Sequence, residues 1–286
     1  MAGGSAEDLA FADVRMPADM VDLLAGGEAS LEAARRAIEF VRAALRSGST
    51  EIARQGLAYP ASEITLLPPV LRPSKVVCLG LNYRPHAAET RMAVPECPLL
   101  FLKVAGSLCG HGQPIVIPRS APDCVDYEGE LAVIIGRRGK YVSKADALSY
   151  VAGYAVGNDV SARDLQMRTS QWASGKMLDT FCPLGPALVT KDEVPDPHAL
   201  RIRTLLNGNV MQDASTAIMI FDIPTIVSFL SSIVTIEPGD VILTGTPEGI
   251  GHARKPPVYM KAGDTVTVEI ETVGTLTNPL IGDQEP

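Results

Sequence analysis

The sequence predicts a mixed α/β protein that is mostly β-strand, with a small N-terminal domain. Three observations support this fold class. The 286 residues include 25 Gly and 22 Pro, which favours many strands joined by tight turns. Helical periodicity is concentrated in the first 70 residues, whereas short apolar and β-branched runs dominate from residue 75 onward. The later helices are few and irregularly spaced, so a repeating βαβ sheet is not expected.

The N-terminal region is expected to be helical. Apolar residues recur at helical spacing in residues 17–24 and 30–46, and Ser30 is a candidate N-cap for the second helix. Prolines then gather between residues 60 and 73, where they mark a junction. We therefore predict a small domain with a proline-rich linker over residues 1–70, and a larger domain over residues 71–286.

Most of the larger domain is predicted to be strand. Short apolar or alternating runs bounded by turn residues predict strands at residues 76–79, 99–103, 115–117, 131–135, 150–156, 203–206, 209–212, 241–243 and 265–271. The Asn-Gly pair at residues 207–208 predicts a hairpin. Asp222, followed by Pro224 in the first turn, predicts the start of a helix with one apolar face.

Composition and charge narrow the class of protein. A net charge of −8 argues against nucleic acid or an anionic membrane as the main partner. The five cysteines are odd in number and contain no C-x-x-C pair, so we expect reduced thiols in a cytoplasmic protein. No run approaches the roughly 20 apolar residues of a membrane span, and the N-terminus lacks the features of a secretory signal. A cleaved organellar transit peptide is left open.

The most informative motif is DYEGELAVII, at residues 126–135. Glu128 and Glu130 point the same way if this segment is a strand, because side chains alternate faces. Two neighbouring carboxylates at the mouth of a buried strand repel each other and lose hydration, and a cation between them would relieve both costs. Oxygen ligands favour Mg²⁺, Mn²⁺ or Ca²⁺. Asp159, just after a predicted strand, is the third candidate ligand; a solvated strand end and a turn are the plainer interpretations.

A histidine and a glutamate form the second candidate group. His86 and Glu89 lie three residues apart in a predicted helix, so they share a face and can form a hydrogen bond. Such a carboxylate raises the basicity of the histidine and fixes its tautomer, which suits a general base. An exposed surface pair is the alternative. None of the other three histidines lies in a comparable strand–loop–helix segment; these are His111, His198 and His252.

Two further motifs lie near strand ends. Ser161 and Asp164 form an S-x-x-D pattern that predicts a helix cap, and Arg163 and Gln166 would then lie on one face of that helix. The loop TGTPEG at residues 244–249 follows a strand, and its backbone N–H groups and hydroxyls could hold a carboxylate.

These motifs occur in the order found in the fumarylacetoacetate hydrolase superfamily, which the chain resembles from about residue 74 to its end. The match rests on the blocks GLNYRxHxxE, DYEGELA, GNDVSARDLQ, GKxxDTFCPLGP and LTGTPEG. Residues 166–280 are most similar to the branch called fumarylacetoacetate hydrolase domain-containing protein 2. Pro85 stands where the family usually has Asp.

The resemblance implies a mixed β-sandwich roll that usually forms a homodimer. It implies a Mg²⁺ or Mn²⁺ ion whose ligands are Glu128, Glu130 and Asp159. The implied catalytic residues are His86, Glu89 and Lys176, of which the lysine would stabilise oxyanion charge. The implied substrate-binding residues are Tyr83, Arg84, Arg163, Gln166, Gly245 and Thr246.

The expected reaction follows from this site. A 2-oxo carboxylate would chelate the metal, which would stabilise the enolate that leaves when a C–C bond breaks. We expect a hydrolase of acylpyruvate-like or 2,4-dioxo acids, acting in aromatic or keto acid catabolism, with water activated by His86 and Glu89. The same enolate would form in oxaloacetate decarboxylation or keto–enol tautomerisation, so both are alternatives. A non-catalytic ligand-binding relative is a third, although it would need neither a base nor Lys176.

Overall fold

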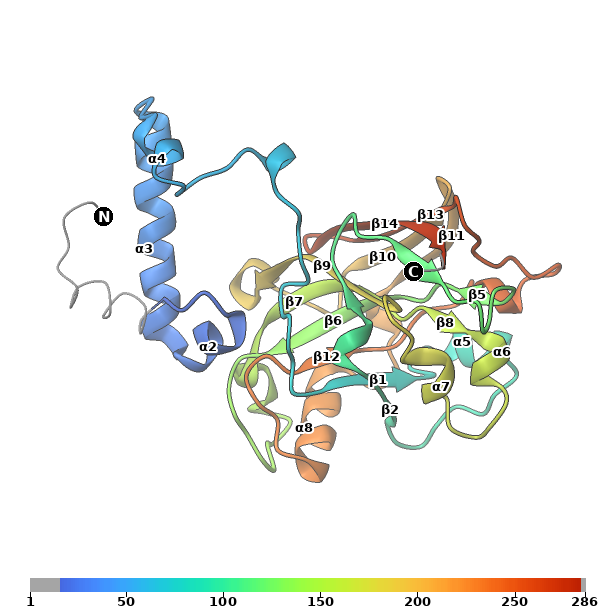
Figure 1. The fold of residues 1–286 in the computed structure, drawn as a ribbon. Helices are drawn as coiled ribbons and strands as arrows, with labels where there is room; N and C mark the ends of the chain where they lie inside the picture. Colours follow the sequence, from blue (N-terminus) through green and yellow to red (C-terminus); the bar gives the residue numbers. More distant parts are fainter. Residues whose placement is uncertain (1–15, 284–286) are drawn as a thin grey trace. The chain divides into compact units, whose positions relative to one another are not determined.

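The computed structural model describes residues 16–283, in two compact units that divide between Thr65 and Leu66. The first unit is helical (Figure 1), with α2 (Met20–Ala25), α3 (Gly27–Arg46), α4 (Glu51–Arg54) and the 3-10 helix η1 (Ala61–Glu63). The predicted cap at Ser30 is wrong, because α3 already begins at Gly27. Gly27 has a φ of 61°, which glycine adopts readily, so the turn before the helix falls there.

The second unit consists mainly of two sheets. The seven-stranded sheet has the order β2-β1-β12-β6-β7-β9-β3. Its strands are β1 (Val76–Gly80), β2 (Leu99–Lys103), β3 (Leu108–Cys109), β6 (Gly129–Ile135), β7 (Val151–Asn158), β9 (Cys182–Thr190) and β12 (Val241–Leu243). The five-stranded sheet has the order β11-β10-β13-β14-β4. Its strands are β4 (Ile115–Ile117), β10 (Arg201–Leu206), β11 (Asn209–Ser215), β13 (Thr265–Ile270) and β14 (Gly274–Gly282).

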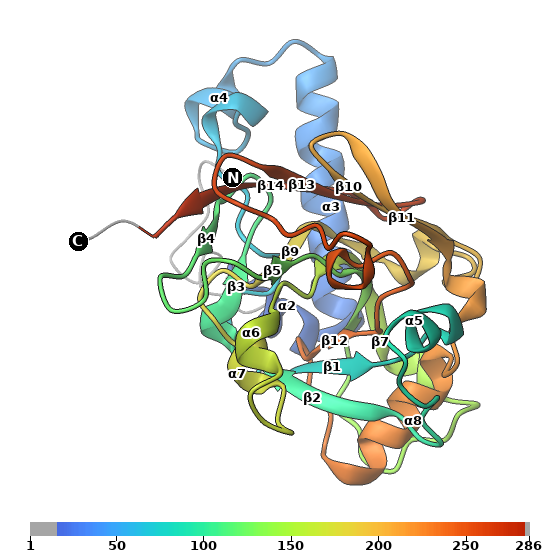
Figure 2. The ribbon, with the colours of Figure 1, turned by 90° about the vertical axis from the view of Figure 1, so that its right-hand side faces the viewer.

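The remaining elements of this unit are short, apart from one helix. A two-stranded ribbon joins β5 (Val125–Asp126) and β8 (Ser161–Ala162). The α-helices are α5 (Arg84–Glu89), α6 (Arg163–Gln166), α7 (Ala173–Lys176) and α8 (Ile223–Ile233). The 3-10 helices are η2 (Ala105–Ser107), η3 (Ala147–Tyr150), η4 (Lys191–Glu193), η5 (Thr216–Ile218) and η6 (Gly251–Ala253). Figure 2 shows α6 and α7 next to each other, with α5 apart from them on the right of the view.

The main hydrophobic core joins the two sheets and α8. It includes Leu131 and Val133 from β6, Val268 from β13 and Ile226 from α8, all almost wholly buried. Every residue of β6 is buried, and after Glu130 the strand is a continuous apolar run rather than an alternating one. The mixed, mostly β fold predicted from the sequence is confirmed. Across residues 16–283, no helix is long and apolar enough to cross a membrane.

Two predicted helix starts have different outcomes. Asp222 caps α8, since its side chain accepts a hydrogen bond from the N–H of Thr225 at 2.8 Å. The predicted S-x-x-D cap is wrong. Ser161 lies in β8, where it pairs with Asp126, and its hydroxyl donates to the carbonyl oxygen of Asp159 at 2.9 Å. Pairing keeps the backbone of Ser161 extended, so α6 begins two residues later, at Arg163, without a side-chain cap.

Candidate metal centre and active site

Three carboxylates meet where β6 and β7 come together. Glu128 directly precedes β6, Glu130 lies on it and Asp159 directly follows β7. The antiparallel pairing of these strands places Asp159 beside Glu128, whose carbonyl oxygen accepts the N–H of Asp159 at 2.8 Å. One carboxylate oxygen from each of the three residues lies within 4.8 Å of the others, and all three side chains are buried. This group could hold a divalent cation.

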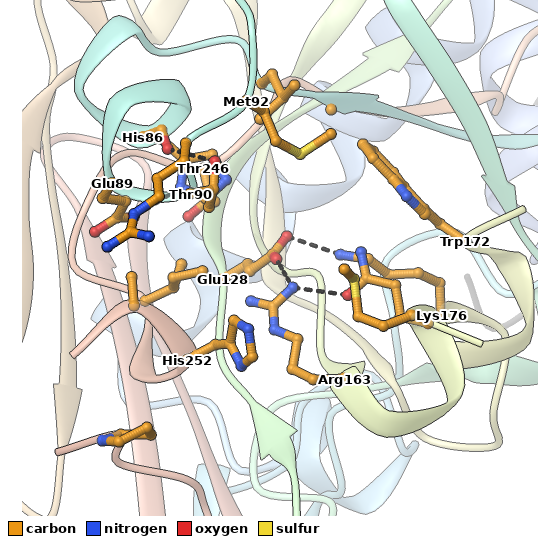
Figure 3. A pocket seen from close by; sticks show the side chains of 18 of the residues that line it. His86, Glu89, Thr90, Met92, Glu128, Arg163, Trp172, Lys176, Thr246 and His252 are labelled. Atoms are coloured by element: carbon orange, nitrogen blue, oxygen red, sulfur yellow. Dashed lines mark hydrogen bonds and ion pairs between the residues drawn. The ribbon is translucent and has the colours of Figure 1, made fainter. Parts of the chain in front are cut away.

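Buried cations surround two of these carboxylates. Lys176, at the end of α7, contacts Glu128 at 2.8 Å and Asp159 at 2.7 Å. Lys103, at the end of β2, contacts Asp159 at 2.6 Å. Arg163 contacts Glu128 at 2.6 Å, and Figure 3 shows Arg163 and Lys176 approaching that carboxylate from two sides. Lys103 was not predicted as a site residue, because nothing in the strand LLFLK shows that its last side chain is buried.

The two glutamates have opposite electrostatic environments. Burial alone would raise the pKa of Glu128, but Lys176 and Arg163 hold this pKa well below its usual range. Burial, together with the charges of Asp159 and Glu128, raises the pKa of Glu130 well above its usual range. One oxygen of Glu130 accepts the N–H of Gly245 at 2.6 Å, whereas its other oxygen is buried without a hydrogen-bond partner among the described residues.

This unpartnered oxygen is the observation that tests the fit of a metal. A buried carboxylate oxygen without a partner is costly in free energy. Glu130 lies beside the carboxylates of Glu128 and Asp159, and the three residues together offer only carboxylate oxygens as ligands. Hard cations such as Mg²⁺ and Mn²⁺ prefer such ligands. The residues present therefore fit a hard divalent cation.

A histidine–glutamate pair lies on α5 beside this cluster. The Nδ1 atom of His86 is 2.8 Å from Glu89 Oε1. The second oxygen of Glu89 accepts the N–H of Gly249 at 2.8 Å, which ties α5 to the loop after β12. Gly249 has a φ of 103°, and a Cβ atom there would lie 2.3 Å from the carbonyl oxygen of Met211, so the close approach needs glycine. With Nδ1 held by Glu89, Nε2 is the ring nitrogen left for chemistry.

One cavity of about 570 Å³ is lined by the His86–Glu89 pair and by Glu128, whereas Glu130 and Asp159 do not line it. Its polar lining includes His86, Glu89, Glu128, Arg163, Gln166, Lys176 and Thr246. Met92, Phe101 and Trp172 give it an apolar wall, and Figure 3 shows Met92 and Trp172 on the side away from His252. The loop after β12 adds His252, Arg254 and Lys255. The cavity therefore combines carboxylates, cations and a base with an apolar wall.

The predicted substrate-binding residues lie in different places. Arg163, Gln166 and Thr246 line the cavity, and Arg163 donates to Gln166 Oε1 at 3.0 Å. The other three do not line it. Tyr83 is wholly buried, Arg84 is exposed at the start of α5, and the N–H of Gly245 donates to the carboxylate of Glu130. The substrate-binding roles stay predictions.

Sequence reasoning missed Asp126 as a site residue, although it begins the DYEGELAVII motif. Its buried carboxylate accepts two hydrogen bonds from Arg163, at 2.7 and 2.9 Å. It also accepts the backbone N–H groups of Gly251 at 2.8 Å and His252 at 2.9 Å. No local motif in the sequence indicates a fixed position for His252. In the structure, its backbone is held by Asp126, which lies 126 positions earlier.

The fold and the site define an enzyme family. Residues 75–281 match the family model described as fumarylacetoacetate (FAA) hydrolase C-terminal, which covers most of the chain. The chain therefore belongs to the fumarylacetoacetate hydrolase family of enzymes. It is 47% identical over 281 residues to proteins from Bos taurus and Homo sapiens that are both named oxaloacetate tautomerase FAHD2A, mitochondrial. These alignments cover 98% of the chain and 85% of each relative. They confirm the predicted similarity to the domain-containing protein 2 branch.

A solved structure supports the same conclusion about the fold. Fumarylacetoacetate hydrolase from the psychrophilic Exiguobacterium antarcticum superposes with a TM-score of 0.73 at 43% identity, covering 78% of this chain and 80% of that one. The expected fold type, with mixed curled sheets and few helices, is therefore confirmed.

The expected cytoplasmic location is contradicted by the relatives, since both are named as mitochondrial proteins. The expectation rested on reduced cysteines and on the lack of a secretory signal. Both features fit any reducing compartment, so they do not distinguish the cytoplasm from the interior of an organelle.

Proposed function

We propose that the protein is a metal-dependent oxaloacetate tautomerase, which interconverts the keto and enol forms of a 2-oxo dicarboxylic acid. The observation that supports the reaction type is that one cavity is lined both by the His86–Glu89 pair and by Glu128, a member of the Glu128–Glu130–Asp159 cluster. The substrate is suggested by the relatives named oxaloacetate tautomerase. The names of these relatives favour keto–enol tautomerisation, which the sequence analysis gave as an alternative, over C–C bond hydrolysis.

Glu128, Glu130 and Asp159 would hold Mg²⁺ or Mn²⁺. When bound, such an ion supplies Lewis-acid polarisation of the 2-oxo acid oxygens, which acidifies the neighbouring C–H group. Lys176 and Lys103 balance part of the carboxylate charge through their contacts with Asp159.

His86 would move the proton in this reaction. Because Glu89 accepts the Nδ1 proton, the neutral imidazole presents Nε2 as a base. That nitrogen would take the proton from C3 of the keto acid and deliver it to the C2 oxygen, which gives the enol. In the reverse direction it would carry the proton from that oxygen back to C3. Glu89 would stabilise the imidazolium that forms in between, since the pair lies in a largely buried position.

Two fixed cations would stabilise negative charge on the substrate oxygens. Lys176 and Arg163 line the cavity and are already oriented by Glu128. Asp159 and Glu128 raise the pKa of Lys176 despite its burial, so its ammonium group stays charged. Preorganised charges of this kind require little rearrangement during the reaction. Gln166, held by Arg163, offers an amide to the carboxylate of the substrate.

The test is to follow keto–enol conversion of oxaloacetate by the chelator-treated protein and after addition of Mg²⁺ or Mn²⁺. We expect the treated protein to be inactive and the added ion to restore activity. Decarboxylation is measured on the same samples by pyruvate formation. Full activity after rigorous chelation would contradict the proposal, and so would pyruvate formation as fast as the enol–keto conversion.

C–C bond hydrolysis is the second candidate, because the His86–Glu89 pair could also activate a water molecule. The structural neighbour named fumarylacetoacetate hydrolase supports keeping it. An acylpyruvate offered under the same conditions separates the two reactions. Hydrolysis with a higher kcat/KM than oxaloacetate tautomerisation would favour the hydrolase. The homodimer expected from the resemblance stays a prediction, which light scattering of the purified protein would test.

A further inference from the structure

A basic rim borders the cavity on the side of the loop after β12. We define this rim as His252, Arg254 and Lys255, all of which line the cavity. His252 and Lys255 are exposed and Arg254 is half-buried, in contrast to the buried cations of the metal centre. Figure 3 shows the His252 ring beside Arg163, pointing into the same space as Glu128. The rim therefore faces the outer part of a ligand whose inner end lies near Glu128.

The rim is fixed to the metal centre through one carboxylate. Asp126 Oδ2 accepts both the N–H of His252 and two donors of Arg163, and Arg163 contacts Glu128. Gly251 approaches so closely that a Cβ atom there would lie 1.8 Å from the carbonyl oxygen of Val258. The loop cannot shift without breaking these contacts. His252 is thus held at a set position relative to the floor of the cavity.

The orientation of the His252 ring leaves a hydrogen-bond donor for a ligand. Its Nδ1 atom is 2.7 Å from the hydroxyl of Tyr259. Burial and the neighbouring Cys124 raise the pKa of Tyr259 to about 12, so the hydroxyl keeps its proton. The hydroxyl can donate this proton to Nδ1 in the neutral tautomer that carries its own proton on Nε2. The protonated ring also has a proton on Nε2, so an anion is a suitable partner in both charge states.

The two cations of the rim are not neutralised within the protein. Arg254 donates to the carbonyl oxygens of Met211 and Gly249, at 2.5 and 3.4 Å. Those acceptors are uncharged. Neither Arg254 nor Lys255 forms an ion pair with any carboxylate in residues 16–283. This contrasts with Lys176 and Arg163, each of which contacts two carboxylates.

From this arrangement we infer that the rim is a subsite for a second carboxylate of the substrate. His252 Nε2 would donate to that carboxylate, and Arg254 and Lys255 would supply positive charge. The protein would thereby select 2-oxo dicarboxylic acids over 2-oxo monocarboxylic acids. This inference rests on the proposed function for the placement of the 2-oxo acid end at Glu128. The loop after β12, which has no part in proton transfer, would then discriminate between substrates.

Two ligands that cannot enolise test the inference by calorimetry on the Mg²⁺-loaded protein. Oxamate has the 2-oxo acid type of head group alone, and N-oxalylglycine has the same head group with a second carboxylate. We expect the wild type to bind N-oxalylglycine about tenfold more tightly than oxamate, the effect of one charge-assisted hydrogen bond. His252→Leu should remove most of this preference without changing the affinity for oxamate. His252→Gln should retain part of it, because the amide can still donate.

Lys255→Gln should weaken N-oxalylglycine binding about threefold, since an exposed cation contributes modestly. Lys261→Gln is the matched control, because it removes the same charge from an exposed residue that does not line the cavity. It should leave both affinities unchanged. Unchanged oxamate binding also shows that each variant is folded.

Equal binding of the two ligands by the wild type would overturn the inference, as would a full preference in both His252→Leu and Lys255→Gln. These results are distinguishable from a failure of the proposed function. If oxaloacetate is not tautomerised but the preference depends on His252, the subsite stands and the proposed reaction fails. If oxaloacetate is tautomerised without any such preference, the reaction stands and the subsite fails.

Discussion

The floor and the rim of the cavity hold their charges in different ways. On the floor, the buried Lys176 contacts the buried carboxylates of Glu128 at 2.8 Å and Asp159 at 2.7 Å. On the rim, Arg254 and Lys255 have no carboxylate partner among the described residues. Buried charges must be compensated if they are to stay charged, whereas exposed charges can be left to water or to a ligand. The charges of the floor are therefore held in place by one another, whereas the cations of the rim are available to bind a ligand.

Asp126 is the residue that connects the two regions. It is wholly buried, and it binds Arg163 of the floor and the backbone N–H of His252 on the rim through the same oxygen. Changes on the floor should consequently abolish chemistry, changes on the rim should alter selectivity, and a change at Asp126 should do both.

The largest effect is expected from Glu130→Gln. The amide is nearly isosteric with the carboxylate but is a poor ligand, so the cation loses one of its three protein ligands. Tautomerisation should fall about 1,000-fold, since Lewis-acid assistance contributes several kcal/mol. Added Mg²⁺ should also no longer raise Tm. In the wild type, an ion at 100 times its Kd should contribute about 2.7 kcal/mol, a rise of roughly 5–10 °C. Normal Mg²⁺ stabilisation of the variant would exclude Glu130 as a ligand.

His86→Ala is expected to have the next largest effect. Loss of the general base should lower kcat by roughly 100-fold, whereas Mg²⁺ should stabilise the variant as it does the wild type. His198→Ala is a suitable control, because His198 lies outside the cavity and accepts the N–H of Ile223 at 3.0 Å. Its kcat should change less than twofold. Turnover of His86→Ala at the wild-type rate would remove this residue from the mechanism.

Asp126→Asn tests the connection between floor and rim. The neutral amide leaves Arg163 with one carboxylate instead of two, so the orientation of both regions loosens. Removing a partner that positions a metal-site residue typically costs about 10- to 100-fold. Calorimetry should show weaker binding of both oxamate and N-oxalylglycine. A loss confined to N-oxalylglycine would place Asp126 with the rim alone.

The smallest effect is expected from Tyr259→Phe. This change removes the hydroxyl that holds His252 Nδ1 but leaves the imidazole in place. One neutral hydrogen bond contributes about 0.5–1.5 kcal/mol, so N-oxalylglycine should bind roughly threefold more weakly. Oxamate affinity and kcat for oxaloacetate should not change. Equal weakening of both ligands would show that Tyr259 supports the fold of the loop rather than the orientation of His252.

The strands were largely predictable, because the local sequence pattern indicates them. Strands β2, β4 and β12 have the predicted bounds, and the hairpin at residues 207–208 is present. Short apolar runs between turn residues give this information without any distant contact. The caps at Ser30 and Ser161 were mispredicted, since in each case a neighbouring feature, a glycine turn or a strand pairing, decided where the helix begins.

The sequence by itself determined the fold class and singled out the three acidic residues, because each lies at the end of a strand that the local pattern predicts. The pairing of β6 with β7 then brings Asp159 to Glu128. Only the tertiary structure decided which cations join them. A lysine is usually exposed, and Lys103 and Lys176 are buried because carboxylates from other strands compensate their charge. The place of His252 was likewise decided by Asp126 and Tyr259. Compensation between distant charges depends on distances in space, which no local pattern of residues contains.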